Sequence, residues 1–320
     1  GELPRRVLLV ARRAGQTALT ALAAVGAVGA GAAVWGVGIE RYLFTVRRHT
    51  LAVLPAGSRA LKVLHVSDAH MAPWQHRKQQ WMATLADLEP DLVVNTGDNL
   101  GHAEGLVGIR RAFDSLRGIP GVFVHGSNDV SAPSPRNPFR YFLGPSRTKH
   151  REVALDTDAL DSYLRDELGW MDLNNAAVSL AVGGLRLDAF GVSDAHRGWE
   201  RLDALPGALE TLGDRSEAAL TLGVTHAPYR HVLDAFVDLG ADTLWAGHTH
   251  GGQVRIPGSA SALVANCDIP LDQARGLSRW ARAGRDVPLN VSAGIGHSIF
   301  APVRFGCRPE ASLITLTARA

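Results

Sequence analysis

The chain has 320 residues, with 33 Lys and Arg against 31 Asp and Glu, a formal net charge of +2 at pH 7 and 46% hydrophobic residues. A charge this close to balance gives no support to a nucleic-acid-binding protein, which carries a strongly basic face. Cys267 and Cys307 are the only cysteines and lack metal-type spacing, so they either pair, if the domain is exported, or stay buried thiols.

The first predicted element is a membrane-spanning helix at residues 14–39. This run contains no charged residue and is dominated by Leu, Val, Ala and Gly, and about 20 apolar residues suffice to cross a bilayer. Trp35 and Tyr42 lie near its expected interface. Basic residues flank the run on both sides, with Arg5, Arg6, Arg12 and Arg13 before it and Arg41, Arg47 and Arg48 after it. Residues 1–13 are therefore predicted to be a basic tail.

The slight excess of basic residues before the span favours a single-pass protein of the cell membrane, with the N-terminus in the cytoplasm and the rest of the chain outside. Arg5-Arg6 also resembles a twin-arginine export signal. The apolar run is longer than a usual signal-peptide core, which favours a retained anchor over cleavage. We expect the lipid bilayer to be a partner through this helix, residues 40–59 to be a juxtamembrane linker and residues 60–320 to be one domain.

Strand-like and helical patterns alternate along residues 60–320. About 260 residues are enough for one large core. Five segments are apolar runs that end in polar groups, at 61–70, 91–99, 121–129, 220–228 and 242–247. Helices are predicted at 75–88, 104–117, 160–168 and 230–239, a hairpin at 176–182 and 185–192, and closing strands at 288–292 and 311–316. This order predicts an α/β fold in which two mixed β-sheets pack as a sandwich flanked by helices, preceded by one transmembrane helix.

Polar side chains stand at the carboxyl end of each apolar run, where ligands bind in open α/β sheets. They are Asp68 and His70, Asp98, Asn128 and Asp129, His226, and finally His248 and His250. The last two lie in Gly247-His248-Thr249-His250-Gly251-Gly252-Gln253, where residues i and i+2 can point the same way and glycines let the backbone bend. Any one of these groups alone is explained by a cap or a turn. Their convergence favours a metal site.

In this order, D-x-H, GD-N, an Asn-bearing strand end, a lone His and GHTH resemble the calcineurin-like metallophosphoesterases over about residues 60–316. The GHTHGGQ form is similar to the membrane-associated phosphodiesterases and lipid-precursor pyrophosphatases within that family. The resemblance implies two metal ions. One would be held by Asp68, His70, Asp98 and His250, and the other by Asp98, Asn128, His226 and His248. Carboxylate, imidazole and amide ligands without thiolate suit Mn, Fe or Zn in a catalytic site.

The chain departs from the family at the third segment. Where the family reads G-N-H-D, with Asn on the metal and His as the acid, this chain reads Gly126-Ser127-Asn128-Asp129. With Asn128 as the ligand, Asp129 occupies the acid position, and it either carries a raised pKa or has no acid role. His125 and His102 are the replacement candidates, or are ordinary polar histidines. Without an acid, substrates with a good leaving group are favoured, such as pyrophosphates or activated diesters.

Residues 130–158 form an insertion that follows Asn128 directly and should overhang the metal site. Its prolines exclude a helix or a central strand, and it mixes aromatic with basic side chains, which suits a phosphate-bearing amphiphile or simply a solvated loop. Arg140, Arg147 and Lys149, together with Arg304 further along the chain, are the predicted phosphate-binding residues. A structural ion pair is the alternative for Arg304.

These observations predict a dinuclear metal-dependent hydrolase of phosphodiester or pyrophosphate bonds, acting by attack of metal-activated water on a membrane-associated or lipid-linked substrate. Two alternatives stay open. One is a catalytically silent metal-binding scaffold or sensor on the membrane, and the other is a tethered phosphatase or nuclease for soluble substrates.

Overall fold

The computed structural model describes residues 3–135, 144–145 and 153–319. Its first elements are α1 (Leu3–Ala33), the π-helical segment η1 (Val34–Ile39), the 3₁₀ helix η2 (Glu40–Tyr42), β1 (Thr45–Leu54), β2 (Leu61–Val66), α2 (His76–Ala83), η3 (Thr84–Leu88), β3 (Leu92–Asn95), α3 (Gly105–Phe113), η4 (Asp114–Leu116), β4 (Gly121–Phe123) and η5 (Ser127–Asp129). Then follow α4 (Thr157–Ser162), η7 (Tyr163–Glu167), β5 (Met171–Asp172), β6 (Ala176–Val182), β7 (Leu185–Gly191), η8 (Leu202–Ala204), α5 (Leu205–Glu210) and η9 (Arg215–Glu217). The chain closes with β8 (Leu220–Val224), α6 (Arg230–Asp238), β9 (Thr243–Ala246), η10 (His250–Gly252), β10 (Gly276–Arg282), β11 (Arg285–Val291) and β12 (Glu310–Ala318).

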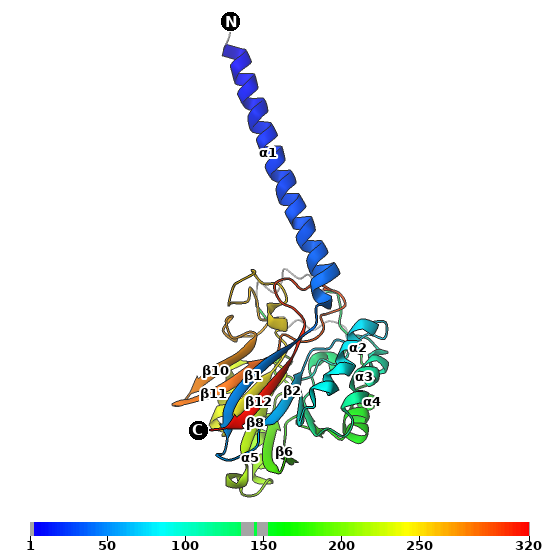
Figure 1. Ribbon diagram of the computed structural model, residues 1–320, viewed down its shortest axis with the longest axis vertical. Coiled ribbons are helices and arrows are strands. Elements are labelled where there is room, and N and C mark those ends of the chain that lie inside the picture. Colours follow the sequence, from blue (N-terminus) through cyan, green and yellow to red (C-terminus); the bar gives the residue numbers. More distant parts are fainter. Residues whose placement is uncertain (1–2, 136–143, 146–152, 320) are drawn as a thin grey trace.

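The N-terminal helix stands away from the rest of the molecule (Figure 1). Within the described residues, one helical stretch, Gln16–Tyr42, is long and apolar enough to cross a membrane. Its apolar side chains are exposed, among them Leu19, Leu22, Val25 and Val28. A helix that is apolar and exposed along most of its length lacks the buried face that a core helix has.

The described residues of the domain form two six-stranded mixed sheets. The first has the order β1-β12-β2-β3-β4-β5 and the second β10-β11-β9-β8-β7-β6. β2, β3 and β4 run parallel to one another, as do β7, β8 and β9. The carboxyl ends of both parallel runs lie at the end of the domain from which α1 leaves (Figure 1).

Three apolar clusters hold the layers together. Alternate residues of the two sheets, such as Val63, Val94 and Leu222, pack face to face in the central cluster. A second cluster packs the first sheet against the helices of residues 76–116 and 157–168, and a third packs the second sheet against α5 and α6. The expected α/β sandwich of two mixed sheets flanked by helices is confirmed.

The segment 40–59, expected to be a linker, contains the ten-residue strand β1, which pairs in parallel with β12 from Thr45 and Glu310 onwards. Arg47 forms an ion pair with the buried Glu310. Only the last two residues of β1, Val53 and Leu54, are buried. Exposed and half-buried positions alternate along β1, but Arg47 and His49 occupy half-buried positions, so the polar–apolar alternation by which a strand is found in a sequence is missing.

Candidate metal centre

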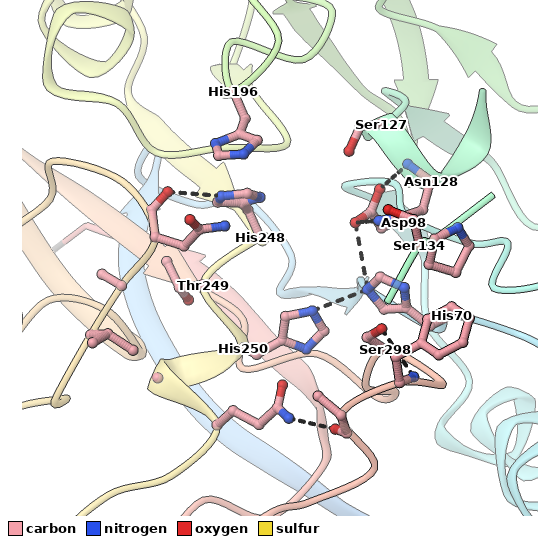
Figure 2. A pocket seen from close by; sticks show the side chains of 18 of the residues that line it. His70, Asp98, Ser127, Asn128, Ser134, His196, His248, Thr249, His250 and Ser298 are labelled. Atoms are coloured by element: carbon pink, nitrogen blue, oxygen red, sulfur yellow. Dashed lines mark hydrogen bonds and ion pairs between the residues drawn. The ribbon is translucent and has the colours of Figure 1, made fainter. Parts of the chain in front are cut away.

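The polar groups at the strand ends come together from both sheets. Asp68 and His70 follow β2, Asp98 follows β3, Asn128 follows β4, His226 follows β8, and His248 and His250 follow β9. Figure 2 shows two banks facing each other, with His248 and His250 on one and His70, Asp98 and Asn128 on the other. The sandwich brings residues that are far apart in sequence into one site, because the parallel strands of both sheets end at the same edge.

Five of these seven residues have a left-handed backbone. The φ angles are 49° at Asp68, 41° at His70, 53° at Asp98, 67° at His248 and 49° at His250. Each such residue costs of order 1–3 kcal/mol, and such strain persists where the surrounding structure imposes it, typically at functional sites. Gly126 provides the room, since a Cβ on it would lie 2.2 Å from Asp98 Oδ1. These backbone turns aim side chains of successive segments at one point.

The first group of candidate ligands is Asp68, His70 and His250, whose ligand atoms all lie within 4.8 Å of one another. His70 Nε2 lies 3.0 Å from His250 Nε2, and Asp68 Oδ1 lies 3.6 Å from His250 Nε2. Asp68 Oδ1 is buried and has no hydrogen-bond partner within the described residues. A buried carboxylate oxygen without a partner is costly unless a cation satisfies it.

The second group is Asp68, Asp98 and His226, with His248 beside it. His226 Nδ1 donates to the carbonyl of Thr96 at 2.7 Å, and His248 Nε2 donates to the carbonyl of Asn266 at 3.2 Å. In each neutral ring the other nitrogen therefore carries the lone pair. These two nitrogens, His226 Nε2 and His248 Nδ1, face each other at 3.3 Å. Carbonyl partners that fix the tautomer in this way are typical of metal-bound histidines.

Asp98 lies between the groups. Its Oδ2 is 3.5 Å from both His70 Nε2 and His226 Nε2. Asn128 donates to the same carboxylate through its backbone N–H and its side-chain amide, each at 2.8 Å. This is the position from which one carboxylate contacts two cations. Residues able to hold a metal pair are thus Asp68, His70, Asp98, Asn128, His226, His248 and His250.

The electrostatics of the site favour bound positive charge. Burial lowers the pKa of His70 to about 4, so its ring is neutral at pH 7 and presents a lone pair. Burial alone would lower the pKa of His226 too, but Asp98, Asp194 and Asp68 outweigh it and raise the pKa to about 9. Burial raises the pKa of Asp68 to about 7. Three buried carboxylates with one protonated imidazole among them form a site that a divalent cation fits.

The ligands open into a cavity of about 440 Å³. Polar residues such as Ser127, Ser134 and Ser298 line it near the candidate ligands (Figure 2). The first residues of the insertion, Ser131 to Ser134, form part of its wall. Arg140, Arg147 and Lys149, predicted to bind phosphate, lie outside the described residues.

Asp129 and His125, expected to carry acid chemistry, do not line this cavity. The Asp129 side chain is fully buried and accepts hydrogen bonds from the backbone N–H groups of Asp98, Asn99, Leu100 and Gly126. His125 Nε2 donates to Asp161 at 2.5 Å. Burial alone would lower the pKa of His125, but its bonds to Asp129 and Asp161 raise the pKa to about 10. Both residues hold the loops that carry Asp98 and Asn128.

Arg304 is fully buried and is directed at the protein instead of the cavity. Its Nη1 donates to the carbonyl of His250 at 3.0 Å, and its Nη2 donates to the carbonyl of Gly294 at 3.2 Å. Arg304 therefore fixes the loop of a candidate ligand. His102, the other replacement acid, packs edge-on against Trp74 at 4.9 Å between ring centroids and is absent from the cavity wall. Cys267 and Cys307 are free thiols.

Sequence reasoning missed Asp194 and His196. His196 lines the cavity, its ring lies 4.4 Å from that of His248, and its Nδ1 lies 3.0 Å from Tyr229 Oη. Asp194 is fully buried, and burial raises its pKa to about 6. A signal was present, because residues 192–196 read V-S-D-A-H, identical to residues 66–70. The copy also follows a strand end, that of β7.

Comparison with known proteins places the sequence within one family. The calcineurin-like phosphoesterase family matches residues 61–252. An uncharacterized metallophosphoesterase of Bacillus subtilis strain 168, YkoQ, is 24% identical over 80% of this chain and 83% of its own length. A second protein of that organism, the uncharacterized YpbG, is 24% identical over 81% and 82%. Among solved structures, a 5'-nucleotidase precursor from Thermus thermophilus is 12% identical with a TM-score of 0.44, covering 81% of this chain and 55% of that chain.

Proposed function

Because the chain belongs to the calcineurin-like phosphoesterase family, a group of dinuclear metal enzymes, we propose that it is a metal-dependent hydrolase of phosphodiester or pyrophosphate bonds in an amphiphilic substrate. The observation that carries the proposal is the pair of ring nitrogens of His226 and His248 facing each other at 3.3 Å beside the Asp98 carboxylate. When both rings are neutral, their two lone pairs point toward each other and toward the Asp98 carboxylate, an arrangement that a bound cation would satisfy.

When bound, a metal pair would acidify a water molecule and neutralise the oxygens of the phosphoryl group. The other residues of the chain hold and orient the candidate ligands. The Thr96 and Asn266 carbonyls keep two rings in one tautomer, and Arg304 fixes the loop of His250. His196, which lines the cavity next to His248, is placed to contact a phosphoryl oxygen.

The state of Asp129 supports a substrate with a good leaving group. Its carboxylate accepts from four backbone N–H groups and does not line the cavity, so it does not reach a leaving group there. A general acid contributes about 10²–10⁴-fold where the leaving group is poor. A pyrophosphate or an activated diester needs less of this help. The apolar N-terminal helix supports the amphiphilic part, because it would hold the domain at a membrane.

The test uses the full chain in detergent, loaded in turn with Mn²⁺, Fe²⁺ and Zn²⁺, with bis-p-nitrophenyl phosphate as the first substrate. Turnover that needs metal and is lost in Asp98→Asn supports the proposal. Metal bound at two equivalents without turnover of any diester or pyrophosphate would make the chain a silent scaffold. A lipid diphosphate and a nucleotide diphosphate of matched bond type are then compared, and preference for the nucleotide would contradict the amphiphilic substrate.

A further inference from the structure

The C-terminal end of the apolar helix is fixed to the loop that supports the metal centre. Glu40 is 4% exposed and accepts hydrogen bonds from the backbone N–H groups of Gly306 at 3.0 Å and Cys307 at 2.8 Å. One turn earlier, the carbonyl of Gly36 accepts from Arg304 N at 3.0 Å. A Cβ on Gly36 would lie 3.0 Å from the Arg304 carbonyl oxygen, which is tighter than an ordinary contact, so glycine eases the close approach. Two contacts one turn apart set the direction of the helix as well as its position.

The helix and the domain have little room to move against each other. Only Leu43 and Phe44 separate η2 from β1. Phe44 stacks on Trp81, with ring centroids 5.1 Å apart, and Thr45 N donates to the Pro309 carbonyl at 3.0 Å. The helix therefore holds the domain at a set orientation to any membrane that it crosses.

Exposed apolar side chains lie at the cavity mouth. We define the apolar rim as Val254, Ile256, Leu263 and Phe300, which are 37%, 60%, 39% and 47% exposed. All but Ile256 line the cavity. Val254 forms a β-bridge with Phe305, which joins this segment to the loop that contacts Gly36. Figure 1 shows the loops around residues 250–270 and 295–309 beside the base of α1.

The length of the helix, compared with the thickness of a bilayer, places the apolar rim at the lipid surface. The charge-free run 14–39 is α-helical to Ala33 and by that residue has risen about 30 Å at 1.5 Å per residue, which is roughly the thickness of the hydrocarbon core of a bilayer. Gly36, which touches Val303 and Arg304, lies inside that run. Just beyond it, the guanidinium groups of Arg41 and Arg77 lie 4.5 Å and 4.8 Å from the ring centre of Tyr42. Tyrosine and arginine together are typical of the headgroup level.

We propose that the apolar rim enters the surface of a phospholipid bilayer, so that the cavity opens onto the membrane and receives its substrate from there. The partner is lipid, because the rim is continuous with a helix end whose own side chains are apolar and exposed, such as Trp35, Val37 and Ile39. The binding of the rim to lipid does not depend on catalysis. The delivery of substrate through it rests on the proposed function.

The first experiment measures insertion without any turnover. In a Cys267→Ser background of the full chain, Ile256→Cys, Phe300→Cys and, as a control, Glu210→Cys are each labelled with the environment-sensitive dye NBD. Glu210 is exposed in α5, which lies at the far end of the domain from α1 (Figure 1). The proteins are reconstituted into phosphatidylcholine–phosphatidylglycerol vesicles with and without nitroxide-labelled lipid. Labels at 256 and 300 should shift to the blue and lose most of their emission to the nitroxide, while the label at 210 does neither.

Labels at 256 and 300 that behave like the label at 210 would overturn the proposal. Blue-shifted labels that the nitroxide does not quench would also overturn it, since a second copy of the chain or another protein would then cover the rim. Melting curves of the unlabelled variants show that each folds. A failure of the proposed hydrolase would leave these results unchanged, so the two ideas fail separately.

A second experiment tests delivery. Ile256→Ser, at the rim residue that lies outside the cavity wall, should raise KM for a vesicle-embedded lipid diphosphate by about tenfold, while kcat for bis-p-nitrophenyl phosphate stays within about twofold. The matched control is Val107→Ser, because Val107 is 48% exposed on α3 and lies outside the cavity wall. An equal loss on both substrates would contradict delivery through the rim, as would no loss on either.

Discussion

Two clusters of histidine and aspartate lie a few residues apart in this protein and are built in opposite ways. Around His125, the carboxylates of Asp129 and Asp161 are taken up by an imidazolium and by backbone N–H groups. Around Asp98, ring nitrogens face each other, and one oxygen of Asp68 lacks a partner within the described residues. In the first cluster both carboxylates have partners from the protein, whereas in the second a carboxylate oxygen of Asp68 has none that the described residues supply and would be satisfied by a cation. The same residue types therefore support the loop in one place and form a ligand site in the other.

The largest effect is expected where the incomplete cluster loses its centre. Asp98→Asn removes a carboxylate that lies 3.5 Å from a histidine of each group, so metal content should fall by both equivalents and activity by well over 100-fold, beyond the 10- to 100-fold typical of a residue behind the ligands. His250→Ala should lose mainly one equivalent. Elemental analysis and turnover of bis-p-nitrophenyl phosphate give the answer. Less than one equivalent of transition metal per chain in reconstituted wild-type protein would contradict the dinuclear site.

Asp129→Asn tests whether the cluster of His125, Asp129 and Asp161 stabilises the fold instead of taking part in catalysis. Hydrogen bonds to a charged group contribute about 1.5–3 kcal/mol, so the free energy of unfolding should fall by at least that much in urea titrations. Hydrolysis of good-leaving-group diesters by the folded fraction should stay within about tenfold, because no acid is lost. A loss of 10³-fold in a variant that keeps its stability would place Asp129 in the chemistry.

The pH dependence of stability sharpens the contrast. The pKa of His125 is raised from 6.5 to about 10 in the folded protein. Its contribution to stability is thus fully present below pH 6.5 and is lost as the pH rises through 10. The difference in unfolding free energy between wild type and His125→Gln, measured in urea, should shrink steadily from pH 6 to pH 10. A constant difference would mean that the ring is neutral throughout and only packs.

The smallest effect is expected at Glu40. Like Asp129, this carboxylate accepts hydrogen bonds from backbone N–H groups, but the loop that it holds carries Arg304, which in turn contacts the candidate ligand His250. Glu40→Gln weakens two hydrogen bonds to the loop of residues 306–307. We expect the weakening of each bond to lower the turnover rate by a factor of about 3–10 at most. Turnover of a soluble diester in detergent should fall by about two- to tenfold. The exposed Glu104→Gln serves as the control. An unchanged rate would show that the helix end holds the domain without affecting the metal centre.

The sequence by itself determined the ends of the parallel strands and the side chains placed there. Apolar runs followed by Asp68, Asp98 or His226 are local patterns. Parallel strands of one sheet end at one edge, so the meeting of Asp68 with Asp98 follows from strand geometry. The approach of His226 from the second sheet follows from the packing of the two sheets. The helices at 75–88, 104–117 and 230–239 were predictable because helix periodicity is also a local pattern. The structure has α2 with η3, α3 with η4, and α6 there.

Only the tertiary structure decided which charged groups face the cavity. Asp129 and Asp98 are neighbours because β3 and β4 pair, and Arg304 reaches the carbonyl of His250 across 54 residues of chain. Residue type does not tell whether the Asp129 or the Arg304 side chain faces the cavity or the protein interior, since a carboxylate or a guanidinium suits a ligand site and a buried network equally well. β1 was hidden because an edge strand buries few side chains. Long-range contacts decide whether a polar group is satisfied by the protein, and that distinguishes the candidate metal centre from the residues that support it.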